Sequence, residues 1–427
     1  MTLQLKNIGM IKEANVKIDG LTVIAGENST GKSTIGKLLF SLIKSSSRYN
    51  EDLEEGKEEK ILSLVRENYN ELRKEVDFSE NREYQRLFST YSFSRDIRRY
   101  AQDAIDERLD FLKDTSLVNI EKNLQNIKKT LLEDSNIEEA QKSAFKKVLI
   151  SEFKGKISTQ NDLNQMTSIK INEGKNKVID IELLNDEIQS FSLVDELSFS
   201  DATFIESPIV LQLSETVGTS KTYFEEFNFD DISRRMRSNV PLHIKDLDNK
   251  LKIASYEDDL FESEDSVNKL LLTLSSIIDG NFQYFRKEID FKYTSKEGKI
   301  FDSLNTATGF KAFGIIQMLL KNSIINKTSL LILDEPEVHL HPKWQLKYAE
   351  MIVELVRNDI NVLVSSHSPY MIQALIKYAR DNEDITDKSN FYLAQKEEDY
   401  STFENVNEDL NKIFELLAEP MNEVFEL

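Results

Sequence analysis

The stretch G-E-N-S-T-G-K-S-T at residues 26–34 is a complete phosphate-binding loop of the form G-x-x-x-x-G-K-[ST]. A short apolar run at residues 21–25 leads into the loop as a predicted buried strand, and Ile and Leu recur at helical spacing over residues 35–43 behind it. In this context the glycines let the backbone wrap around phosphate groups, while the loop N–H groups and the helix N-terminus meet their negative charge. The sequence therefore predicts nucleotide binding by Gly26, Asn28, Ser29, Thr30, Gly31, Lys32, Ser33 and Thr34.

Two side chains of this loop have specific expected roles. Lys32 is placed to reach the β- and γ-phosphates, and the Ser33 hydroxyl is placed to hold Mg²⁺. We therefore expect ATP and Mg²⁺ as the cofactors. The alternative is a chance match to the pattern, which the flanking strand and helix make rare.

A second group of candidate residues follows two later apolar runs. Residues 329–333 read S-L-L-I-L, which is typical of a strand buried on both faces of a parallel sheet, and Asp334 and Glu335 come directly after it. In this Walker B-like arrangement Asp334 would hold Mg²⁺ and Glu335 would orient and polarise the attacking water as general base. Residues 361–366 form another predicted buried strand, and His367 at its end can contact a γ-phosphate.

Two further segments admit more than one interpretation. The segment from Leu304 to Lys311 opens an apolar helix, so its small residues form either a second phosphate-binding surface or an ordinary N-cap at Thr308. His339 and His341 suggest either zinc or a structured loop that faces a second subunit. Zinc is disfavoured because the chain has no cysteine and only four histidines.

The net charge and the lengths of the apolar runs indicate which kinds of partner the chain favours. The chain has 427 residues, enough for two or three domains, and its 54 Lys and Arg against 75 Asp and Glu give a net charge of −21. No apolar run is long enough for a membrane span and no signal peptide opens the chain, so we expect a cytoplasmic protein. An acidic surface repels nucleic acid on average, and any such contact needs a local basic patch. The candidates for such a patch are Arg95, Arg98, Arg99, Arg234, Arg235, Arg237, Lys146 and Lys147.

The periodicity changes along the chain and suggests its organisation. Residues 49–153 contain no proline, and their apolar residues recur every three or four positions, which predicts an inserted arm of antiparallel helices. Those apolar stripes form either the arm's own core or a partner-binding surface. The predicted parts are residues 1–48 and 154–215 (first part of the head), 49–153 (arm), 216–280 (helical lobe), 281–395 (second part of the head) and 396–427 (short C-terminal extension).

The motifs together resemble ABC-type ATPase heads of the SMC and RecF kind. The resemblance rests on G-E-N-S-T-G-K-S, T-A-T-G-F-K, L-L-I-L-D-E-P-E-V-H-L-H-P and S-S-H-S-P in that order, and it covers residues 1–45 and 165–395. The likeness is greatest to the bacterial group that contains the OLD-family ATPases and anti-phage defence ATPases such as PtuA of Septu and AriA of PARIS. It implies an α/β fold with a long inserted helical arm and a second helical lobe.

The same resemblance implies a homodimer or higher homo-oligomer. In that family two heads sandwich ATP, which would place Thr308, Gly309 and Lys311 of one chain on the γ-phosphate bound by the other, and would make His367 the switch histidine. This chain departs from the family in two ways. The transporter signature L-S-G-G-Q is replaced by A-T-G-F-K, and only about 60 residues follow His367, too few for the Toprim nuclease of OLD proteins.

Three functions remain open at this point. The first is an ATP-driven sensor or scaffold that controls a separate effector, a nuclease or toxin, in anti-phage defence. The second is a DNA-repair ATPase resembling RecF or the SMC heads, which clamps DNA. The third is the motor subunit of a transporter, which the 302 positions between Lys32 and Asp334 disfavour because a compact motor needs far fewer.

Overall fold

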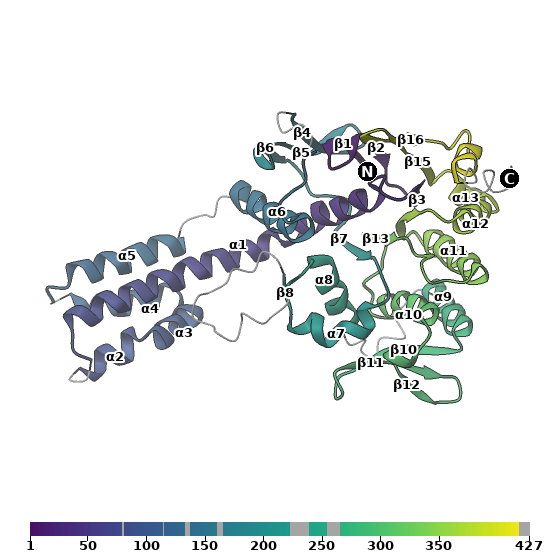
Figure 1. The fold of residues 1–427 in the computed structure, drawn as a ribbon. Coiled ribbons are helices and arrows are strands. Elements are labelled where there is room, and N and C mark those ends of the chain that lie inside the picture. The colour runs from purple at the N-terminus through teal and green to yellow at the C-terminus, as the bar shows by residue number, and fades with distance from the viewer. Residues whose placement is uncertain are drawn as a thin grey trace. The chain divides into compact units, whose positions relative to one another are not determined.

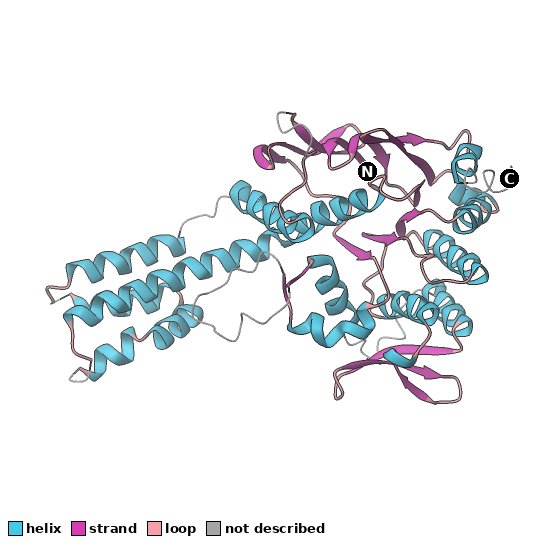
Figure 2. Ribbon diagram, in the orientation of Figure 1, coloured by secondary structure: helices cyan, strands magenta, loops and turns pink. Residues whose placement is uncertain are grey.

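The protein, as a computed structural model, divides into two compact units (Figures 1 and 2). We call Met1–Ser47 with Phe145–Leu427 the head, and Arg48–Ala144 the arm. The structure describes residues 1–78, 81–113, 115–132, 137–159, 165–222, 239–253 and 265–417. Within these residues, every helix is too short or too polar to cross a bilayer.

The head is built on a sheet of eleven strands in the order β6-β5-β4-β1-β2-β16-β15-β3-β14-β13-β7. In chain order the strands are β1 (Thr2–Ile8), β2 (Ile11–Lys17), β3 (Leu21–Gly26), β4 (Thr167–Glu173), β5 (Asn176–Leu184), β6 (Glu187–Leu193), β7 (Asp201–Ile205), β13 (Ser329–Asp334), β14 (Asn361–Ser366), β15 (Ser389–Glu397) and β16 (Tyr400–Asn405). Strands β15, β3, β14, β13 and β7 pair in parallel, whereas β6, β5, β4, β1 and β2 pair antiparallel. The parallel strands therefore bring their carboxyl ends to one edge.

Helices cover both faces of the parallel strands. Successive side chains of β13 point to opposite faces of the sheet. Leu330 and Ile332 pack in the core beneath α1 (Lys32–Glu75) and α6 (Ile137–Phe153), and Leu331 and Leu333 pack in the core on the opposite face. That second core also contains residues of α10 (Thr308–Lys321), α11 (Pro342–Arg357) and α12 (Pro369–Arg380). The continuous apolar run of β13 is thus explained by burial on both faces, and the predicted α/β fold class is confirmed.

Further elements complete the head, and most of them add residues to the second core. They are α7 (Val210–Thr219), α8 (Leu242–Leu251), α9 (Asp265–Ile277), α13 (Glu383–Thr386), a short strand pair β8 (Lys221–Thr222) and β9 (Asn239–Val240), and a sheet of β10 (Gly280–Phe285), β11 (Asp290–Ser295) and β12 (Ile300–Asp302). The predicted lobe at 216–280 contributes α8 and α9. Their buried residues Leu247, Leu251 and Leu274 pack in the same core as α10.

The arm has an apolar core of its own. It consists of the C-terminal part of α1 with α2 (Arg82–Phe88), α3 (Thr90–Tyr100), α4 (Gln102–Leu112) and α5 (Val118–Leu132). Apolar residues that recur every three or four positions meet in this core, which includes Val65 and Leu72 of α1 and Leu124 of α5. Arg108 is also fully buried there, and it donates to Leu87 O at 2.7 Å, Ala104 O at 2.6 Å and Asp96 Oδ2 at 2.8 Å. Its charge is therefore satisfied within the arm.

Two predicted boundaries differ from the structure. The arm was expected to end at residue 153, but the compact unit ends at Ala144, because Phe145, Val148 and Leu149 pack into the core of the head. Residues 396–427 were expected to form a short C-terminal extension, but β16 lies within the main sheet, between β15 and β2. The candidate basic residues Arg234, Arg235 and Arg237 lie outside the described residues.

Candidate nucleotide-binding site

The phosphate-binding loop joins β3 to α1 at the carboxyl edge of the sheet. Its backbone requires glycine at two positions. Gly26 has a φ of +155°, and a Cβ added there would lie 2.4 Å from Ala394 O. Gly31 has a φ of +88°, and a Cβ added there would lie 2.9 Å from the Ile11 side chain. Ser29, between them, is also left-handed, with φ +62°. The loop thus turns sharply against β15 and β2 without side chains in the way.

Lys32, the first residue of α1, folds its ammonium group back onto the loop. Its Nζ donates to Gly26 O at 2.9 Å and to Glu27 O at 2.5 Å. Burial lowers the pKa of Lys32, and the carboxylates of Glu335 and Asp334 oppose that shift. The cation is therefore held within the loop, close to acidic side chains from another strand.

Ser33 and Asp334 meet across the edge of the sheet, although 301 positions separate them. The Ser33 hydroxyl donates to Asp334 Oδ1 at 3.0 Å, and the Ser365 hydroxyl donates to the same oxygen. The strand order β3-β14-β13 explains the meeting, because β14 alone separates the loop strand from the strand that ends in Asp334. Burial raises the pKa of Asp334, and the two hydroxyl hydrogen bonds oppose the shift.

Glu335 follows in a constrained turn. Its φ is +47°, a region that costs a residue with a side chain roughly 1–2 kcal/mol, and its N–H donates to Ser365 O at 2.9 Å. Its side chain stays 30% exposed, and Oε1 lies 3.4 Å from His367 Nδ1. The turn therefore places a partly solvated carboxylate beside both the loop lysine and the histidine.

Glu337 is a site residue that the sequence analysis did not single out. Its carboxylate is buried, and Oε1 accepts hydrogen bonds from Ser366 Oγ, His367 N and Ser368 N. His367 Nδ1 also lies 3.5 Å from this carboxylate. The only sequence signal for it is a second acidic residue two positions after Glu335.

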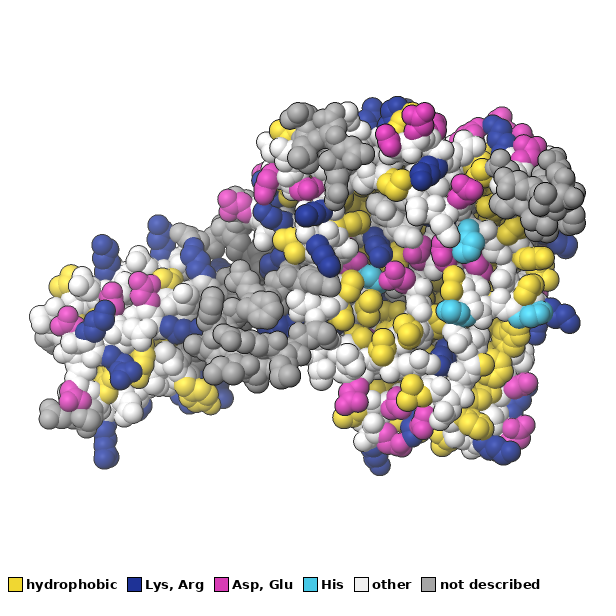
Figure 3. All heavy atoms as spheres, viewed as in Figure 1, with side chains coloured by type: hydrophobic (Ala, Val, Ile, Leu, Met, Phe, Trp, Pro, Cys, Tyr) yellow, Lys and Arg dark blue, Asp and Glu magenta, His cyan; other side chains and the backbone are white. Residues whose placement is uncertain are grey.

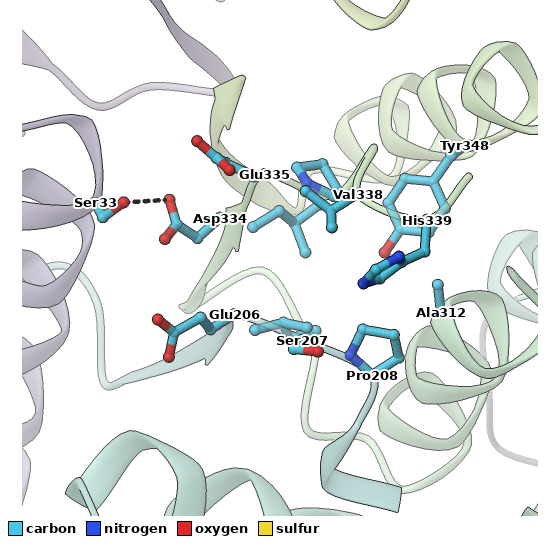
Figure 4. A pocket seen from close by; sticks show the side chains of 13 residues that line it. Ser33, Glu206, Ser207, Pro208, Ala312, Asp334, Glu335, Val338, His339 and Tyr348 are labelled. Carbon is cyan, nitrogen blue, oxygen red and sulfur yellow. Dashed lines mark hydrogen bonds between the residues drawn. The ribbon is translucent and has the colours of Figure 1, made fainter. Parts of the chain in front are cut away.

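A cavity of about 320 Å³ opens next to Ser33 and Asp334 (Figure 4). Its lining includes Glu206 and Ser207, which directly follow β7, and His339. Figure 4 shows Glu206 and Asp334 extending from neighbouring strand ends toward the helix that carries Ser33. Glu206 was also missed, because a lone glutamate after a strand carries no motif.

The other candidate residues lie elsewhere. Thr308, Gly309 and Lys311 begin α10, and none of the three lines this cavity. Lys311 is buried, which lowers its pKa, and an added Cβ on Gly309 would lie 3.3 Å from Leu340. His341 is the N-cap of α11, where its Nδ1 accepts from Lys343 N–H at 3.3 Å.

The donor set fits Mg²⁺ with a nucleotide better than zinc. Among the described residues, no group of three or more His, Asp or Glu side chains could hold a metal. Ser33 and Asp334 instead supply one hydroxyl and one carboxylate, both oxygen donors. Mg²⁺ binds through one or two protein oxygens and completes its shell with water and substrate phosphates, so this sparse set suits it.

The fold of the head and the site at the carboxyl edge of its main sheet together define a P-loop ATPase. The chain belongs to the AAA ATPase domain family, which matches residues 1–372. It is also 28% identical over 88 residues to the uncharacterized protein MJ1542 of Methanocaldococcus jannaschii, covering 21% of this chain and 10% of that protein. Over 178 residues it is 25% identical to the Retron Vc95 probable ATPase of Vibrio cholerae serotype O1 biovar El Tor, covering 34% of each.

These matches span a tenth and about a third of the length of the two curated relatives. Among solved structures, the SMC head domain from Thermotoga maritima is similar, with a TM-score of 0.38 and 10% identity over 95% of this chain and 98% of that chain.

Proposed function

We propose that this chain binds MgATP at the edge formed by β3, β14 and β13, and hydrolyses it. The observation that carries the proposal is the convergence of Lys32, Ser33 and Asp334 with Glu335 and His367. These residues come from three separate parts of the chain, and a merely structural turn would not need a lysine, two carboxylates and a histidine together.

Each residue has a role that follows from its chemistry. Lys32 binds phosphate oxygens, and Ser33 and Asp334, which are hydrogen-bonded to each other, hold the metal. A bound Mg²⁺ would neutralise charge on those oxygens. Glu335 accepts the proton of the attacking water, since its carboxylate is fixed by the backbone yet reachable by solvent. His367 lies beside the carboxylates of Glu335 and Glu337 and senses the γ-phosphate.

We further propose that the active unit is a homodimer or higher homo-oligomer. In ABC-type ATPase heads, which the motifs resemble, the segment equivalent to Thr308 and Gly309 completes the site of a second copy, whereas Lys311 is buried in its own head and is left out of this proposal. The head also exposes apolar side chains on elements around the cavity, namely Ile209, Leu213, Leu304 and Val338. Hydrophobic side chains lie beside the histidines on the face of the head drawn in Figure 3.

We propose that ATP turnover controls a separate effector, a nuclease or toxin, in anti-phage defence. The support is the similarity to the Retron Vc95 probable ATPase, and an arm with its own core that a P-loop ATPase does not need for chemistry. A net charge of −21 suits a basic partner. The rival proposal, a RecF- or SMC-like ATPase that clamps DNA, would use the exposed Arg98 and Arg99 of α3.

The test is expression of the chain within its native operon, followed by co-purification and assays on the isolated chain. We expect phosphate release from ATP, capture of a neighbouring gene product, and no cleavage of DNA or RNA with Mg²⁺ or Mn²⁺. ATP-dependent retention of duplex DNA without a partner protein would favour the rival. Cleavage lost on mutation of a carboxylate outside the ATP site would overturn the effector proposal.

A further inference from the structure

A buried histidine outside the phosphate loop is bonded to two carboxylates. His243, on α8, is 1% exposed. Its Nδ1 lies 2.5 Å from Glu152 Oε2 and its Nε2 lies 3.1 Å from Glu206 Oε2. The Glu152 side chain is fully buried, and Glu206 is the residue that lines the cavity beside Asp334.

Each ring nitrogen of His243 faces a carboxylate oxygen, which favours the imidazolium form. A neutral imidazole could donate to only one of the two carboxylates, whereas an imidazolium donates to both. The backbone supports the same pairing, because His243 N–H donates to the second oxygen of Glu152 at 3.0 Å. The rings of Phe40 and Phe204 lie 6.2 Å and 4.9 Å from the imidazole and exclude water from it.

Glu206 is also bound from the opposite side. Lys37 of α1, one turn after the phosphate loop, places its Nζ 3.4 Å from Glu206 Oε1. One oxygen of Glu206 is thus held by α1 and the other by His243, which is itself held by α6 through Glu152. Helices α1 and α6 are the two segments by which the chain leaves the head for the arm and returns.

We propose that His243 is a positioning residue of the nucleotide site: backed by Glu152, it holds the Glu206 carboxylate in the cavity beside Asp334 and ties it to α6. The inference rests on the proposed ATP hydrolysis. It assigns the buried Glu152–His243–Glu206 chain to turnover rather than to the stability of the head alone.

A neighbouring network provides the matched control. Asp246, one turn further along α8, pairs with Lys44 of α1 at 2.7 Å and with Lys250 at 2.7 Å, and Lys250 also pairs with Asp201 of β7 at 2.7 Å. Like the chain through His243, this network connects α8 with α1 and β7, but none of its four residues lines the cavity. Asp246→Asn should therefore destabilise the head without a specific effect on turnover.

The experiment compares kcat, KM for ATP and thermal stability of the full chain for His243→Gln, Glu152→Gln and Asp246→Asn. Loss of a residue that orients a metal-site ligand typically lowers activity by roughly ten- to a hundredfold, and we expect a residue that orients Glu206 to matter to a similar extent. We expect kcat to fall by about tenfold or more in His243→Gln and by less in Glu152→Gln, whose amide oxygen can still accept, with KM changed less than about twofold. Asp246→Asn should lose stability but keep kcat.

A double variant separates positioning from general damage. If His243 acts through Glu206, adding His243→Gln to Glu206→Ala should lower kcat no further, because linked residues are not additive. Losses in kcat that multiply in the double variant, or a kcat in His243→Gln no lower than in Asp246→Asn, would overturn the inference.

If His243→Gln does not fold, Glu152→Gln is compared with Asp246→Asn in its place. If the wild type releases no phosphate while still binding ATP, the proposed function fails and the inference falls with it, whereas normal wild-type turnover isolates the test of His243.

Discussion

The buried carboxylate of Glu337 accepts a hydrogen bond from the backbone N–H of His367 at 2.9 Å. The same oxygen accepts from Ser366 Oγ at 2.7 Å and from Ser368 N–H at 3.2 Å. The turn that begins α12 is therefore fastened to the loop after β13. The position of His367 depends on a side chain two residues beyond the proposed catalytic base.

Replacing Glu337 with Ala should damage both stability and turnover. The Ser366 hydroxyl and the His367 and Ser368 N–H groups would lose this acceptor, and although Ser368 N–H keeps Ser366 Oγ, a buried donor left unsatisfied costs about 1–3 kcal/mol. We expect urea unfolding to show a loss of at least about 2 kcal/mol and kcat to fall by about tenfold. Glu354→Ala, which breaks a surface pair with Arg357, is the control and should stay within about 0.5 kcal/mol. Unchanged turnover in Glu337→Ala would show that His367 is positioned without it.

Replacing Lys32 with Ala should weaken ATP binding. The substitution removes a charge-assisted donor to phosphate worth about 1.5–3 kcal/mol, which corresponds to roughly ten- to a hundredfold in Kd. Titration with a non-hydrolysable ATP analogue measures the effect, with Lys343→Ala, an exposed lysine of α11, as control. Undiminished affinity in Lys32→Ala would refute the phosphate-loop assignment.

Glu335→Gln should retain nucleotide but stall hydrolysis. The amide keeps the size and hydrogen bonding of the side chain but cannot accept the proton of water, a contribution on the order of a hundredfold. Phosphate release measures the loss, and ATP-bound oligomers should accumulate in size-exclusion chromatography. Glu350→Gln on the exposed face of α11 should behave as wild type. If Glu335→Gln keeps turnover within about twofold, another group is the base.

Two inactive variants should complement each other when mixed. One carries Lys32→Ala, and the other carries Thr308→Val with Gly309→Ala at the start of α10. If each site is completed by a second copy, the mixed dimer has one intact site and recovers part of the wild-type rate. Full activity of a dilute monomer, without rescue in the mixture, would show that the site is complete within one chain.

Acid should weaken the head through Glu206. The hydrogen bond from His243 lowers the pKa of Glu206 from its ordinary 4.5 to about 2. A depressed pKa stabilises the folded state above pH 4.5, and this contribution is lost as the pH falls from 4.5 to about 2. Because Glu206 is partly exposed, the effect is screened. Comparison of urea unfolding at pH 3 and pH 6 should show a smaller acid loss in Glu206→Gln than in the wild type.

His243 carries the opposite pH dependence. Burial opposes its charge, but the bonds to Glu152 and Glu206 outweigh burial and raise its pKa above the ordinary 6.5. Its contribution to stability is therefore complete below pH 6.5 and is lost as the pH rises through the raised value. In Glu152→Gln this alkaline loss should begin at lower pH, because one of the two supporting charges is gone.

The sequence by itself determined the features that are written in contiguous residues. The loop at residues 26–34 needs glycines at fixed positions, and the apolar run of β13 needs burial on both faces, so each was visible as a local pattern. The periodicity of residues 49–153 predicted helices, because one apolar residue every three or four positions marks one helix face. Asp334, Glu335 and His367 were found because each directly follows such a strand.

The tertiary structure alone decided which distant side chains meet. Glu337 acquires its role only when β14 lies beside β13, and Glu206 and Glu152 become partners only when α8 places His243 between them. The strand order also moved residues 396–405 from an expected extension into the middle of the sheet. Single glutamates and histidines carry no periodic signal, and their chemistry depends on neighbours that are brought together by long-range strand pairing and helix packing, which no local stretch of the sequence specifies.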